Sequence, residues 1–110
     1  MQIEFIAAGS PHVVSRAIEE YARAQGHVAA LVVPWESDAT TLSMAVTSVK
    51  GDGWAIEHTN LGTITLTELG PGATRVAIAA HEPDHEEKGR LTALFDRFAR
   101  QLHTRFTAAP

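Results

Sequence analysis

The chain has 110 residues, with thirteen acidic and nine basic side chains and a formal net charge of −4. Its length fits one domain over residues 1–110, and its negative charge argues against a nucleic-acid surface, which needs clustered Lys and Arg. The absence of cysteine excludes disulfides, thiol nucleophiles and thiolate metal ligands. The N-terminus is not basic, and no stretch approaches the roughly 20 apolar residues that cross a bilayer. We therefore expect a cytoplasmic protein without a membrane span.

The first predicted elements are a strand from Ile3 to Ala8 and a helix that follows it. Ser10 suits the N-cap of this helix, Pro11 suits its first position, and Gly26 suits the C′ position after its last turn. Helical spacing places six apolar residues on one face: Val13, Val14, Ala17, Ile18, Tyr21 and Ala22.

The middle of the chain predicts five strands, over residues 28–33, 41–49, 54–59, 63–67 and 75–80. Short turns rich in Gly, Asn, Asp and Pro separate the last four of these strands, at 51–53, 60–62 and 70–72. Apolar and polar residues alternate along most of them, which is typical of an antiparallel meander with one buried face. In the third of the five, Trp54, Ile56 and His58 share one face.

The last predicted element is a long amphipathic helix from Asp84 to Phe106. Asp84 is a plausible N-cap, with Glu87 three residues later, and basic residues fill the second half of the helix. Six large apolar residues recur at helical spacing: Leu91, Leu94, Phe95, Phe98, Leu102 and Phe106. Such a helix needs a sheet to cover. The elements therefore predict an α+β domain in the order β-α-β-β-β-β-β-α, with both helices on one face of an antiparallel sheet.

Two segments carry a resemblance to a known family. Residues 61–69, LGTITLTEL, and residues 70–76, GPGATRV, resemble the penultimate hairpin of bacterial polyketide-cyclase-type members of the START-like helix-grip (SRPBCC) superfamily. The Ser10-Pro11 opening after the first strand is also similar. The resemblance implies a curved sheet that grips a long C-terminal helix, with seven strands in the superfamily where six are counted here. It also implies a hydrophobic-ligand binder, or an enzyme built on the same cavity, and it transfers no catalytic motif.

We expect a small hydrophobic or aromatic ligand between the sheet and the last helix. Six residues are predicted to line its cavity: Met44, Trp54, Ile56, His58, Leu94 and Phe98. An enzyme alternative, a polyketide cyclase or dehydratase, would use His58 as its acid or base, because histidine changes charge near neutral pH. A plain alternative for His58 is a core-edge residue bonded to backbone or water. The third hypothesis is a non-catalytic interaction module that binds a partner, or a second copy as a homodimer, through a helix or the outer face of the sheet.

His81 and His85 are the one pair with a spacing that suits a metal. Two histidines four residues apart can share a zinc ion when both lie on one helix. Pro83 stands between them and breaks that geometry. The sequence therefore predicts no metal site and no cofactor.

Overall fold

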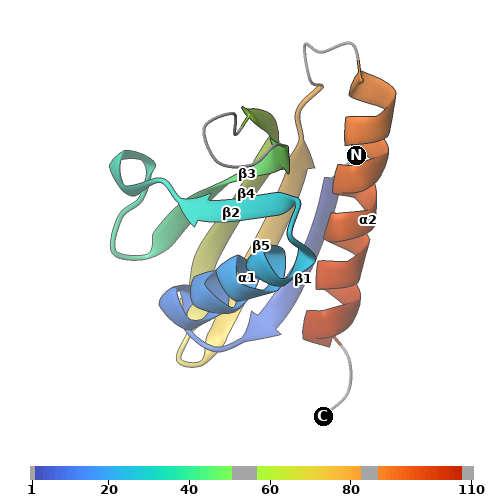
Figure 1. The fold of residues 1–110 in the computed structure, drawn as a ribbon. Coiled ribbons are helices and arrows are strands. Elements are labelled where there is room, and N and C mark those ends of the chain that lie inside the picture. Colours follow the sequence, from blue (N-terminus) through green and yellow to red (C-terminus); the bar gives the residue numbers. More distant parts are fainter. Residues whose placement is uncertain (1, 51–56, 83–86, 108–110) are drawn as a thin grey trace.

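The computed structural model describes residues 2–50, 57–82 and 87–107. Its elements in chain order are β1 (Gln2–Ala8), α1 (Pro11–Gln25), β2 (Val28–Val32), a short 3-10 turn η1 (Pro34–Glu36), β3 (Thr41–Lys50), β4 (Glu57–Gly70), β5 (Ala73–Ala80) and α2 (Lys88–Thr107). The five strands form one antiparallel sheet in the order β1-β5-β4-β3-β2. Figure 1 shows α1 crossing in front of the sheet and α2 running alongside β1.

One face of the sheet is buried because apolar residues alternate with polar ones in register across the strands. Leu42 on β3 pairs with Leu66 on β4, and Leu66 pairs with Val76 on β5. Val76 in turn pairs with Phe5 on β1, and all four side chains are buried. Both helices cover this face, so their apolar residues and those of the strands form one core cluster. The α+β architecture and the antiparallel sheet predicted from the alternation are confirmed.

The two caps of α1 are those that the sequence predicts. The backbone N–H of Val13 donates to the Ser10 hydroxyl at 3.3 Å, and Gly26 has the left-handed φ of 80° that ends the helix. The predicted apolar face is wrong at Val13, which is 61% exposed. The buried stripe instead follows Val14, Ile18 and Ala22 at four-residue spacing, and Val13 lies one residue, or about 100°, away from it.

The count of six or seven strands is wrong for the part of the chain that the structure describes, which has five. Residues 57–59 and 63–67, predicted as parts of two strands, belong to the single strand β4. The register explains this: Val46 pairs with Gly62 and Thr47 pairs with Asn60, so Leu61 is one extra residue on β4. Residues 60–62 therefore form a β-bulge and not a turn. The Asn60 side-chain oxygen accepts the N–H of Gly62 at 3.1 Å and stabilises the bulge.

The bulge changes which residues of β4 face the helices. Beyond it, Ile64 and Leu66 are buried, so even-numbered positions point to the core. Before it, Thr59 pairs with the buried Ser48 and takes the helix side of the sheet, while His58 takes the other side. The predicted turn at 51–53 lies outside the described residues.

Helix α2 follows the predicted apolar pattern closely. Leu91, Phe95, Phe98 and Leu102 are buried, while Leu94 and Phe106 are partly buried against the core. The predicted N-cap Asp84 lies outside the described ranges, and the described helix begins at Lys88. Its main partner is β1, where Phe5 stacks on His103 and Phe106 with ring centroids 5.1 and 6.2 Å apart. Of the helices described, none is long and apolar enough to cross a membrane.

Candidate functional site

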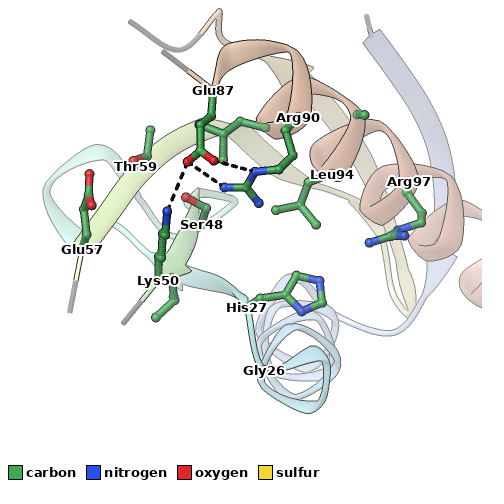
Figure 2. A pocket seen from close by; sticks show the side chains of 13 residues that line it. Gly26, His27, Ser48, Lys50, Glu57, Thr59, Glu87, Arg90, Leu94 and Arg97 are labelled. Atoms are coloured by element: carbon green, nitrogen blue, oxygen red, sulfur yellow. Dashed lines mark hydrogen bonds and ion pairs between the residues drawn. The ribbon is translucent and has the colours of Figure 1, made fainter. Parts of the chain in front are cut away.

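A pocket of about 740 Å³ lies where α2 begins, between that helix, the paired ends of β3 and β4, and the turn that follows α1 (Figure 2). Small-molecule sites typically enclose about 300–1,000 Å³, so the pocket has the size of a binding site. Its apolar lining comes from Val49, Leu91, Ala93 and Leu94. The rest of the described lining consists of Gly26 and the polar or charged residues His27, Ser48, Lys50, Glu57, Thr59, Glu87, Arg90 and Arg97.

Three local features of the chain build this pocket. The bulge in β4 turns Thr59 toward α2, because it reverses the side to which alternate residues point. The His27 carbonyl accepts the N–H of Val49 at 2.9 Å, which ties the turn after α1 to the end of β3. On α2, Arg90, Leu94 and Arg97 recur at helical spacing along the flank of the buried face. The pocket therefore joins segments that are far apart in the sequence.

Glu87 is the centre of an ion-pair network at the upper rim of the pocket. Its carboxylate accepts hydrogen bonds from Arg90 Nη2 at 3.1 Å, from Arg90 Nε at 3.3 Å and from Lys50 Nζ at 3.4 Å (Figure 2). The hydrogen bonds from Arg90 and then from Lys50 lower the pKa of Glu87 from its ordinary value of 4.5. The network links the start of α2 to the end of β3 at neutral pH.

We expect part of the protein's stability to disappear in acid because of Glu87. A carboxylate whose pKa is lower in the folded than in the unfolded state stabilises the fold above its unfolded value. That contribution is lost as the pH falls from 4.5 through the lowered folded value. The Glu87→Gln variant should therefore lose less stability than the parent protein when urea unfolding is compared at about pH 6 and about pH 3.

Glu20→Gln is the matched control for this comparison. Glu20 is exposed on α1, and it makes no ion pair with the residues that the structure describes. Its variant should lose as much stability in acid as the parent protein does. Equal acid losses in Glu87→Gln and Glu20→Gln would show that the rim network does not stabilise the fold.

The four predicted ligand-binding residues that the structure describes lie in different surroundings. Leu94 lines the pocket, while Met44 and Phe98 are buried in the core and do not line it. His58 is exposed and is also absent from the lining, and its Nδ1 lies 3.4 Å from the Thr47 hydroxyl. Trp54 and Ile56 lie outside the described residues.

The charged residues of the lining are among those that the sequence analysis missed. Lys50 and Glu87 meet across 37 positions of sequence, and no local pattern indicates such a contact. Arg90 and Arg97 could have been predicted from the sequence, since they lie four residues before and three residues after Leu94 on the predicted helix.

Of the two histidines considered for a metal, the structure describes His81 alone. His81 Nε2 lies 2.9 Å from the Thr63 hydroxyl, and His85 lies outside the described ranges. Within the part of the chain that the structure describes, no three His, Asp or Glu side chains are grouped closely enough to hold a metal ion.

Comparison with models of known families gives no match for this chain, and comparison with curated proteins and with solved structures gives no significant match either.

Proposed function

We propose that this protein binds a small hydrophobic or aromatic molecule in the pocket between the ends of β3 and β4 and the first half of α2. The observation that carries the proposal is the pocket itself, with a volume of about 740 Å³ and an apolar floor that includes Leu91 and Leu94. The resemblance of residues 61–76 to START-like proteins supports the same class of function. So does the element order, which ends in a long helix packed on an antiparallel sheet.

The ligand site proposed here lies at the end of the sheet–helix interface and not at its middle. Phe95 fills the middle, where it is only 1% exposed. Met44 and Phe98 are buried in the same core cluster as Phe95. Only Leu94, of the predicted residues that the structure describes, reaches the open space.

The two alternative functions have less support. A cyclase or dehydratase needs polar groups that converge on the bound substrate, and the exposed His58 on β4 stands outside the pocket. An interaction module needs a continuous exposed patch. On the outer face of the sheet, the exposed Ile6 and Leu31 lie on the two opposite edge strands, β1 and β2. Both alternatives therefore remain secondary predictions.

Leu94→Asn tests the proposed site. The change keeps the side chain at a similar size but makes it polar, so it removes apolar contact from the pocket floor. Burying a leucine side chain contributes about 1.5–3 kcal/mol, which corresponds to a roughly 10- to 100-fold weaker affinity. The measurement is a fluorescence titration with the neutral apolar probe N-phenylnaphthylamine.

Leu69→Asn is the control, because Leu69 is an exposed leucine at the end of β4 and does not line the pocket. It should leave probe affinity unchanged. The proposal fails if the parent protein does not bind the probe, or if both variants bind it as the parent does. Native mass spectrometry of freshly purified protein would add the mass of any ligand that co-purifies.

A further inference from the structure

The described residues that line the pocket carry a net charge opposite in sign to that of the whole chain. Among the described residues, three cations line it, Lys50, Arg90 and Arg97, against two carboxylates, Glu57 and Glu87. The complete chain has thirteen acidic and nine basic side chains. Helix α2 supplies two of the three lining cations, Arg90 and Arg97, and it carries five of the nine cations of the chain with a single carboxylate, Asp96. Among the described lining residues, cations therefore outnumber carboxylates, and this excess favours an anionic ligand.

Arg97 is the cation that is available to a ligand. Lys50 and Arg90 both bind Glu87, at 3.4 and 3.1 Å. Elsewhere on α2, Arg100 binds Asp96 at 3.0 Å and Arg105 lies over the Tyr21 ring at 5.2 Å from its centroid. Arg97 makes no hydrogen bond or ion pair with any residue in the described ranges.

The charge of Arg97 lies next to the apolar floor of the pocket. It follows Leu94 by three residues, so both lie on the same flank of α2. Figure 2 shows the Arg97 guanidinium pointing toward the space between Leu94 and His27. A molecule seated on Leu94 therefore has a guanidinium beside it, and a guanidinium binds a carboxylate with two parallel hydrogen bonds.

We propose that the ligand is an amphipathic organic acid, with an apolar or aromatic body on Leu91 and Leu94 and a carboxylate on Arg97. This inference rests on the proposed function and adds the chemical class of the ligand to it. The carboxylate goes to Arg97 because a second carboxylate beside Lys50 or Arg90 would compete with Glu87 for the same donors.

An isosteric pair of probes tests the inference. Naphthylacetate and naphthylacetamide differ only in whether the end group is a carboxylate or a neutral amide. Their affinities are measured by displacement of N-phenylnaphthylamine from the pocket. The acid should bind about tenfold more tightly than the amide, a difference of ~1.4 kcal/mol. This preference should shrink as salt is added, because exposed charges are screened.

Arg97→Gln should lower the affinity for the acid to about that for the amide, so that the difference in affinity between the two probes disappears. Arg97→Lys should keep most of the preference, since it keeps the charge. Arg75→Gln is the control for net charge, because Arg75 binds Glu4 at 3.2 Å on strands β5 and β1 and does not line the pocket. It should preserve the preference for the acid.

The possible outcomes separate the inference from the proposed function. If acid and amide displace the neutral probe equally well, or if Arg97→Gln keeps the preference, the acid assignment is overturned while the binding site stands. If the neutral probe does not bind the parent protein at all, the proposed function itself fails.

Discussion

Replacing Phe95 with alanine should lower the free energy of unfolding by roughly 3 to 5 kcal/mol. Among the residues that the structure describes, Phe95 is the largest fully buried side chain, and it lies where α2 meets the centre of the sheet. Truncation removes its apolar contacts and leaves a cavity that the surrounding strands cannot fill, because they are held in register by their hydrogen bonds. Natural domains are stable by about 5–15 kcal/mol, so this one change removes a large share of the total.

The measurement is urea unfolding followed by circular dichroism. With a slope of about 1–3 kcal/mol per molar urea, the midpoint should fall by more than about 1 M, or the variant should be unfolded without urea. Phe106→Ala is the matched control, because Phe106 is only partly buried and stacks on Phe5 near the end of α2. Its cost should be clearly smaller. Equal costs at both positions would mean that Phe95 does not anchor the helix to the sheet.

The parts of the fold that local sequence determines were predictable. A cap depends on a few neighbouring residues, so Ser10 and Gly26 correctly mark the two ends of α1. The buried face of α2 depends on helical spacing alone, and Leu91, Phe95 and Phe98 are buried as predicted. The turn around Pro71 likewise follows from its glycine neighbours, which adopt φ angles that other residues disfavour.

The bulge in β4 was not predictable in the same way. Asn60 and Gly62 are residues that also favour tight turns, so the local sequence is compatible with either structure. The pairing with Val46 and Thr47 on β3 decides between them, and that pairing is a property of the whole sheet. The expectation that His58 faces the ligand failed for the same reason, because the bulge decides to which side of the sheet His58 points.

The candidate site was only partly predictable, for a related reason. The apolar floor residue Leu94 lies on a helical face that the sequence reveals. The charged rim depends on where the end of β3 meets the start of α2, since Lys50 and Glu87 come together only in the folded chain. We expected a cavity beside the last helix from the resemblance to START-like proteins, which stays a prediction. In the structure Phe95 is buried where α2 meets the sheet, and the pocket lies toward the end of the sheet.

Gly62→Ala should destabilise the protein by roughly 1 to 3 kcal/mol, although it adds a single methyl group. A Cβ atom at this position would stand 2.5 Å from the Ala79 carbonyl oxygen and 2.5 Å from Cζ of Phe95. The first contact is with backbone that is paired within the sheet, and the second is with a ring that is packed on all sides, so neither can move cheaply. The absence of a side chain at Gly62 is what lets α2 approach the sheet this closely.

The matched control is Gly89→Ala in the first turn of α2, where an added Cβ would have no other described residue within 4 Å, apart from its chain neighbours and the backbone of its own helix. The same chemical change should there stabilise the protein by up to about 1 kcal/mol, because alanine favours a helix more than glycine does. Urea unfolding of the two variants should therefore shift the midpoint in opposite directions. If Gly62→Ala left the free energy of unfolding unchanged, α2 would lie farther from β4. Open space would then run along the whole interface and not only at its end. Adding Phe95→Leu to Gly62→Ala should recover only part of the free energy of unfolding that Gly62→Ala loses, since the contact with the Ala79 carbonyl remains.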